Sequence, residues 1–70
     1  MRLGNNLRRC RFDHKEMSQE ELANAIGVTR QTIHSIEKGK FVPSTLLALR
    51  LARFFEKTVD EIFYIIEDNE

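Results

Sequence analysis

A row of hydrogen-bonding side chains lies between residues 30 and 38. If this stretch is helical, its side chains turn by about 100° per residue, so Ile33 and Ile36 project to one side. The opposite side then carries amide, hydroxyl, imidazole and two cationic groups, from Arg30, Gln31, His34, Ser35 and Lys38. A helix face that only meets solvent more often carries Glu and Lys. The residue types therefore indicate a surface that hydrogen-bonds to another molecule.

A second short helix directly precedes this row and must position it. Leu22, Ala23 and Ile26 share one helical face. Gly27 then supplies the residue that most readily adopts positive φ, which ends a helix and begins a sharp turn. Thr29 is suited to accept a backbone N–H as the N-cap of the next helix. Residues 19–37 are therefore predicted to form two helices joined by a tight turn.

Three further helices are expected around this pair. The first runs from about residue 5 or 6 to residue 14, with an apolar stripe of Leu3, Leu7, Cys10 and His14. Ser18 with Glu21 forms a capping box that opens the helix at Gln19. Ser44 is the predicted N-cap of a helix over residues 45–55.

The last predicted helix opens at Val59, behind a second capping box of Thr58 and Glu61. Its core-facing residues would be Val59, Ile62, Phe63 and Ile66. Residues 67–70 are acidic and are expected to fray. The sequence thus predicts one all-α domain over residues 1–70, a compact bundle of five helices.

Apolar residues exceed what a small core needs in the helix at 45–55 and in the tail. Such a surplus indicates either burial between two copies of the chain or a thinly covered monomer core. We expect a homodimer whose interface includes six residues: Leu49, Phe54, Ile62, Tyr64, Ile65 and Ile66.

The 70 residues carry no net charge, yet the charges are segregated along the chain. Residues 1–15 hold five basic side chains against one acidic, and residues 56–70 hold six acidic against one basic. Contact with phosphates depends on the local field, whereas net charge mainly sets non-specific attraction. We therefore expect weak non-specific binding to DNA. Lys38 and Lys40 would serve equally well as a solvated helix end or as phosphate contacts.

Several classes of function lack their residues. Cys10 is the only cysteine, so neither an intrachain disulfide nor a cysteine-based metal site is expected. His14 and His34 have no nucleophile or metal-ligand cluster beside them, and no glycine-rich phosphate loop occurs, so we expect no enzyme and no cofactor. The apolar run over residues 62–66 is too short to span a bilayer. We expect a cytoplasmic protein without a membrane segment.

The spacing of the central motif resembles that of a known family. The pattern Q-x-x-x-A-x-x-x-G-V-x-x-x-x-I-x-x-I-E is carried here by Gln19, Ala23, Gly27, Val28, Ile33, Ile36 and Glu37. It is similar to the helix-turn-helix of the lambda-repressor, Cro and Xre family of prokaryotic regulators. The segment from Glu37 to Ser44 also looks like small stand-alone members, and the resemblance extends over residues 7–66.

The resemblance implies a helix-turn-helix at the second and third helices that binds double-stranded DNA. It implies base contacts in the major groove by Arg30, Gln31 and Ser35, with His34 as a secondary candidate. It implies phosphate contacts by Gln19, Thr29, Thr32, Lys38 and Lys40. A homodimer would place two such helices about 34 Å apart on a near-palindrome, as expected of a repressor.

Two positions depart from the family pattern, and a second class of function stays open. Many relatives have glycine near Glu16 and at Glu56, so Glu56 is expected to hold a strained positive φ. The apolar tail and zero net charge also suit an antitoxin-like or adaptor protein, which would hold a protein partner and bind DNA only in an auxiliary way.

Overall fold

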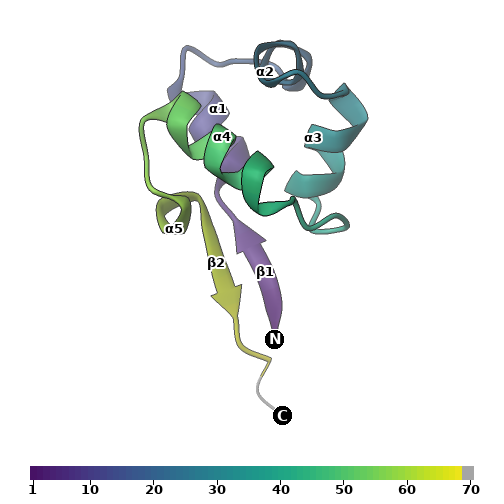
Figure 1. Ribbon diagram of the computed structural model, residues 1–70, viewed down its shortest axis with the longest axis vertical. Coiled ribbons are helices and arrows are strands. Elements are labelled where there is room, and N and C mark those ends of the chain that lie inside the picture. The colour runs from purple at the N-terminus through teal and green to yellow at the C-terminus, as the bar shows by residue number, and fades with distance from the viewer. Residues whose placement is uncertain (69–70) are drawn as a thin grey trace.

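The computed structural model describes residues 1–68. Five helices are present, α1 (Leu7–Asp13), α2 (Gln19–Ile26), α3 (Arg30–Glu37), α4 (Thr45–Phe55) and α5 (Val59–Ile62), together with two strands, β1 (Arg2–Asn5) and β2 (Phe63–Ile66). The helices gather into one body, and the strand pair extends away from it (Figure 1). Residues 69 and 70 of the acidic end lie outside the described residues.

The strand pair corrects the all-α prediction. Leu3, expected on the stripe of the first helix, lies in β1, whereas Phe63 and Ile66, expected on the last helix, lie in β2. The last helix is only four residues long because the run that follows it is aromatic and β-branched, which favours an extended strand. The partner strand lies about sixty residues away in sequence. Local periodicity carries no information about such a pairing.

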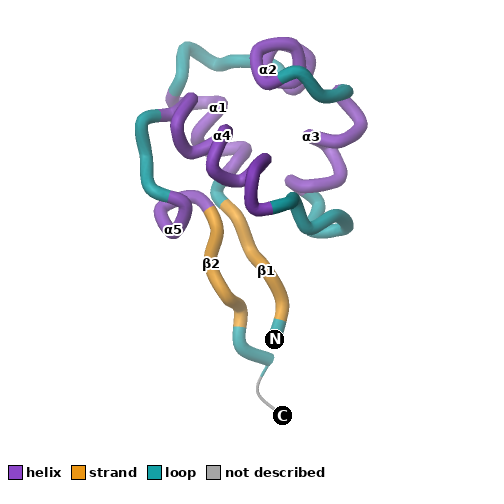
Figure 2. Tube along the Cα trace, in the orientation of Figure 1, coloured by secondary structure: helices purple, strands orange, loops and turns teal. Residues whose placement is uncertain are grey.

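The two strands form an antiparallel ribbon (Figure 2). Leu3 pairs with Ile65, and Gly4 pairs with Tyr64. Paired residues share a face and successive residues alternate, so Leu3 and Ile65 lie on the same face as Phe63, which is buried against the helices. Tyr64 lies on the opposite face, where its ring covers Gly4.

Ion pairs join the two strands at the end of the ribbon. Asp68 accepts hydrogen bonds of 3.0 Å from the N-terminal ammonium group and from Nε of Arg2. These two hydrogen bonds lower the pKa of the Asp68 carboxyl group below its ordinary value. Asp68, which we expected to be frayed, is therefore bonded to the first residues of the chain.

The core is formed by apolar residues from every helix and from β2: Leu7, Cys10, Leu22, Ala23, Ile26, Ile33, Ile36, Leu51, Ala52, Phe55, Ile62 and Phe63. Ile62 is 0% exposed, so it packs within the single chain and offers no surface to a second copy. This corrects its assignment to a dimer interface. Cys10 is buried, and burial raises the pKa of its thiol, as befits a small core side chain.

The predicted helix boundaries are confirmed at most of their caps. Ser18 and Glu21 form the expected capping box, and the side chains of Thr29 and Ser44 each accept a backbone N–H at a helix start. The carboxylate of Glu61 accepts the backbone N–H of Thr58 at 2.7 Å. These local hydrogen bonds fix where four of the five helices begin.

No helix within residues 1–68 combines the length and the apolar character needed to cross a membrane.

Candidate nucleic-acid interface

The turn between α2 and α3 sets the angle of the exposed row. Gly27 adopts the left-handed conformation with φ 89°, and its N–H bonds to the carbonyl oxygen of Ala23 at 2.8 Å. Val28 N–H bonds to the same carbonyl at 3.0 Å. Ala23 is 1% exposed, so a larger side chain there would push the two helices apart. α3 is thus held on α2 by a rigid backbone turn.

α3 presents its polar face outward, as the sequence predicts. Ile33 and Ile36 are buried on its inner face. Arg30 and Gln31 are exposed, whereas Thr32, His34 and Ser35 are half-buried along the same helix. Lys38 and Lys40 are exposed just beyond its end. The side chains predicted to contact bases therefore lie along the outer side of α3, and Thr32, Lys38 and Lys40 lie on the same helix or just beyond its end.

A buried ion pair joins α1 to the end of α3. The Arg11 guanidinium donates to both carboxylate oxygens of Glu37, at 2.5 and 2.9 Å, and also to the carbonyl oxygen of Met17 at 2.8 Å. The two charged side chains are only 13% and 8% exposed. A two-pronged pair of this kind fixes geometry as well as charge.

The same carboxylate extends the network to the exposed face. Gln19 donates to Glu37 at 3.0 Å, and its amide oxygen accepts from Arg30 at 3.2 Å. His34 lies 3.5 Å from the Gln19 amide nitrogen. Gln19 therefore links the buried ion pair to the first residue of α3 and holds the Arg30 side chain in position.

The sequence does not indicate this pair. It identifies Glu37 only as the last residue of the motif, and Arg11 only as one of the five basic side chains in residues 1–15. The available signal was an acidic residue at a helix position close to the buried Ile33 and Ile36, since a buried carboxylate requires a partner. Nothing in the spacing selected Arg11 from its basic neighbours.

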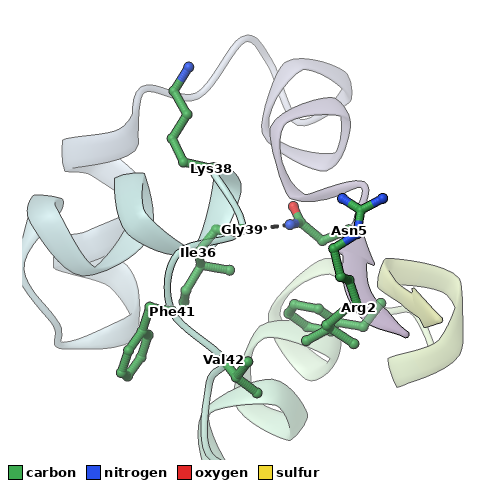
Figure 3. A pocket seen from close by; sticks show the side chains of 9 residues that line it. Arg2, Asn5, Ile36, Lys38, Gly39, Phe41 and Val42 are labelled. Atoms are coloured by element: carbon green, nitrogen blue, oxygen red, sulfur yellow. Dashed lines mark hydrogen bonds between the residues drawn. The ribbon is translucent and has the colours of Figure 1, made fainter. Parts of the chain in front are cut away.

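Two side chains brace the helix ends from elsewhere in the chain. The Asn5 amide donates to the carbonyl oxygen of Ile36 at 2.9 Å (Figure 3). The Asn5 side-chain oxygen accepts the N–H of Leu7. Arg50 of α4 donates to the carbonyl oxygen of Ile26. Both contacts satisfy carbonyl groups near a helix C-terminus, which otherwise lack partners. Neither was predicted.

A shallow concave surface lies between α1 and the two helices of the motif. It is lined by seven polar residues, Arg8, Arg11, Gln19, Arg30, His34, Glu37 and Lys38. The Glu37 charge is matched by Arg11, which leaves Arg8, Arg30 and Lys38 as cations around the surface. This arrangement suits a phosphate group, and Arg8 adds a cation that the sequence analysis had not assigned there.

The residues expected at a dimer interface do not form one surface. Leu49 is 52% exposed and Ile65 is 60% exposed. Ile65 lies on the same face of the ribbon as its pairing partner Leu3. Tyr64 and Ile66 lie on the opposite ribbon face, around Gly4. Phe54 is half-buried and makes an edge-to-face contact with Phe55 at a centroid distance of 5.0 Å.

An apolar groove brings together only part of that set. It runs between β1, β2 and the beginning of α4 and is lined by Leu3, Pro43, Thr45, Ala48, Leu49, Val59 and Phe63. Of the residues expected at the dimer interface, only Leu49 lines this groove. Ile65 lies beside it, on the same face of the ribbon as the groove residues Leu3 and Phe63.

Known helix-turn-helix proteins are similar to this chain. A family model described as helix-turn-helix matches residues 7–62, which is α1 through α5. The chain is 46% identical over 61 residues to the HTH-type transcriptional regulator YgzD of Bacillus subtilis, covering 87% of this chain and 88% of the relative.

Archaeal proteins are equally similar. An HTH-type transcriptional regulator of Methanocaldococcus jannaschii is 48% identical over 66 residues, covering 94% of this chain and 97% of its own. A third, from Methanothermobacter thermautotrophicus, is 49% identical over 53 residues, covering 74% of this chain and 77% of the relative. Because the family model matches most of this chain, the chain belongs to the lambda-repressor and Xre-type helix-turn-helix family.

Proposed function

We propose that the protein is a sequence-specific DNA-binding transcriptional regulator that acts as a homodimeric repressor on a near-palindromic operator. The observation that carries the proposal is the exposed polar face of α3, held in position by the buried Arg11 and Glu37 pair through Gln19. An oriented row of donors and acceptors on a rigid helix is the arrangement that reads base edges in the major groove. The names of the relatives, all HTH-type transcriptional regulators, support the same function.

Base readout is assigned to Arg30, Gln31 and Ser35, with His34 as a further candidate. Arginine suits O6 and N7 of guanine, and glutamine suits N6 and N7 of adenine. In the free protein Gln31 donates to Ser35 over a long 3.4 Å, so both side chains are free to exchange that contact for a base.

Backbone contacts are assigned to Gln19, Thr29, Thr32, Lys38 and Lys40. The two lysines are exposed at the end of α3. The Thr29 hydroxyl caps α3 at Thr32 N–H, 3.2 Å away, so it presents its remaining hydrogen-bonding capacity at the helix start. The Gln19 amide lies at the concave cationic surface.

Readout is tested with operator DNA selected from random duplexes. Replacing both Arg30 and Gln31 by Ala should weaken binding to the selected site by about 100-fold or more in a gel shift, since each good base pair contact contributes roughly 1–3 kcal/mol. Arg53→Ala, at an exposed arginine of α4, removes one charge without touching α3 and should bind like the wild type. Unchanged affinity in the double variant would contradict the assignment.

Dimerisation is assigned to the apolar groove, which Leu49 lines, and to Ile65 on the ribbon face beside it. A two-fold interface uses the same patch on both copies. The protruding apolar side chains of one copy can therefore pack into the groove of the other copy, and the reverse contact forms at the same time. Leu46, 67% exposed at the start of α4, enlarges the same apolar surface.

Light scattering tests this surface. The wild type should have the mass of a dimer, and Leu49→Asp should shift it to a monomer because a carboxylate would have to be buried. Phe12→Asp is the matched control, since Phe12 is 61% exposed on α1, and it should leave the dimer intact. A monomeric wild type would contradict both the dimer and the palindromic operator.

The exposed apolar surface also supports a second candidate, an antitoxin-like or adaptor protein. In that case the surface formed by Leu46, Leu49 and Ile65 would hold a different protein. Purification with a stoichiometric second protein, displaced by Leu49→Asp, would favour this candidate. A homodimer that binds its operator alone would favour the repressor.

A further inference from the structure

We propose that Phe41 recognises the 5-methyl group of a thymine beside the bases contacted by α3. The inference rests on the proposed DNA binding and deepens it. It assigns a specificity-determining role to a residue outside the helix-turn-helix and outside every contact assigned above.

The end of α3 turns Phe41 back along the helix. Gly39 has φ 77°, its N–H bonds to the carbonyl oxygen of Ile36 at 3.0 Å, and Lys40 N–H bonds to that of Ser35 at 2.9 Å. This pair of hydrogen bonds is a Schellman turn, which reverses the chain directly after a helix. Phe41 therefore lies beside α3, where it can share a surface with the recognition face.

The Phe41 ring is not part of the core. It is 47% exposed, although Phe is a residue that usually gains by burial. In Figure 3 the ring points away from Arg2 and Asn5, which lie on the other side of the loop. Phe41 also borders a pocket on the ribbon side of the loop, which Arg2, Leu3 and Phe63 line.

A shallow, open cleft joins this ring to the base-reading residues. It is lined by Lys40 and Phe41 together with Thr29, Gln31, Thr32 and Ser35. Its volume is about 270 Å³. The cleft therefore combines one apolar aromatic wall, several hydrogen-bond donors and a cation that suits a nearby phosphate.

Thymine is the base whose edge fits this combination. In the major groove it presents a methyl group next to the O4 acceptor, whereas cytosine presents an amino donor and no methyl group. The Phe41 ring would contact the methyl group, and the Gln31 amide or Ser35 hydroxyl would donate to O4. Lys40 would bond to the adjacent phosphate. A polar side chain at position 41 would lose only the methyl contact.

Thymine-to-uracil replacement tests the contact, because uracil retains O4 and base pairing but lacks the methyl group. In the selected operator, each thymine is replaced in turn by deoxyuridine. At one position in each half-site the wild type should bind about three- to tenfold more weakly. Phe41→Ala should bind the thymine and uracil forms of that position equally, and Phe41→Leu should retain part of the preference.

Phe12→Ala provides the matched control, since this exposed phenylalanine lies on α1 and not in the cleft. It should keep the wild-type preference for thymine. The inference is overturned if the wild type binds every uracil operator as tightly as the original, or if Phe41→Ala keeps the full preference. Loss of the dimer in Phe41→Ala would also overturn it, by assigning the ring to contact between copies. If the wild type selects no DNA at all, the proposed function itself fails.

Discussion

At the residue scale, Glu56 is a side chain in a backbone conformation that favours glycine. It caps α4 with φ 57° and ψ 44°, in the left-handed region. The sequence predicted this strain from the missing glycine. Lys15 and Glu16 adopt the same region in consecutive positions, with φ 58° and 53°, so the loop between α1 and α2 carries similar strain, of which the sequence indicated only the neighbourhood of Glu16.

Replacing Glu56 by Gly should stabilise the protein. A residue with a Cβ in this region destabilises the folded state by roughly 1–2 kcal/mol. Glycine removes that strain, but it raises the conformational entropy of the unfolded chain, which lowers the stability by about 0.4–1 kcal/mol. The net gain in unfolding free energy should be about 0.5–1 kcal/mol in urea denaturation. Ala25→Gly, on the exposed side of α2, should lose about 1 kcal/mol. A less stable Glu56→Gly protein would show that the carboxylate has an unrecognised favourable contact.

At the element scale, the orientation of α3 depends on a few long-range contacts. The Arg11 and Glu37 pair ties α3 to α1, the Asn5 amide ties it to β1, and the turn at Gly27 ties it to α2. Only the turn is encoded by neighbouring residues. The other contacts join segments that are 26 and 31 residues apart.

α1 contains a matched pair of arginines for testing these contacts. Arg11→Ala should cost about 3 kcal/mol of unfolding free energy, since it leaves the largely buried Glu37 carboxylate with only the Gln19 amide as its partner. Arg9→Ala removes an ion pair with Asp13 whose side chains are 76% and 55% exposed, and should cost well under about 1 kcal/mol. Urea denaturation compares the two directly. Equal losses would mean that the buried pair does not hold α3.

At the scale of the whole molecule, zero net charge coexists with a cationic face. Arg8, Arg30 and Lys38 line the concave surface beside α3, whereas Arg2, Arg9 and Arg11 are ion-paired with carboxylates. The acidic tail lies around and beyond α5. The tail is positioned by the ribbon, which extends the molecule to 39 Å in one direction against 22 Å in the others. The protein can therefore meet phosphates on one side without a strong attraction to DNA in general.

Salt dependence measures that local field. The logarithm of the DNA binding constant should fall linearly with the logarithm of salt concentration. Lys38→Ala and Lys40→Ala should each reduce the steepness by about two, one contact from each copy of the proposed dimer, and weaken all sequences alike. Arg53→Ala should leave the slope unchanged. If the lysine variants keep the wild-type slope, these side chains do not contact phosphates.

The sequence alone determined the parts of this protein that depend on neighbouring residues. Helix caps, the turn at Gly27 and the polar face of α3 each follow from side-chain chemistry within a few positions, and each is present in the structure. The positive φ at Glu56, which the resemblance to the family implied, is present too. The motif spacing was sufficient to identify the family for the same reason.

The tertiary structure alone decided what depends on residues distant in sequence. It converted the expected end of the last helix into a strand paired with residues 2–5, placed Ile62 in the core, and selected Arg11 as the partner of Glu37. It also placed Phe41 beside α3. These outcomes depend on which segments contact each other once the chain is compact. No local pattern of hydrophobicity or charge specifies those long-range contacts.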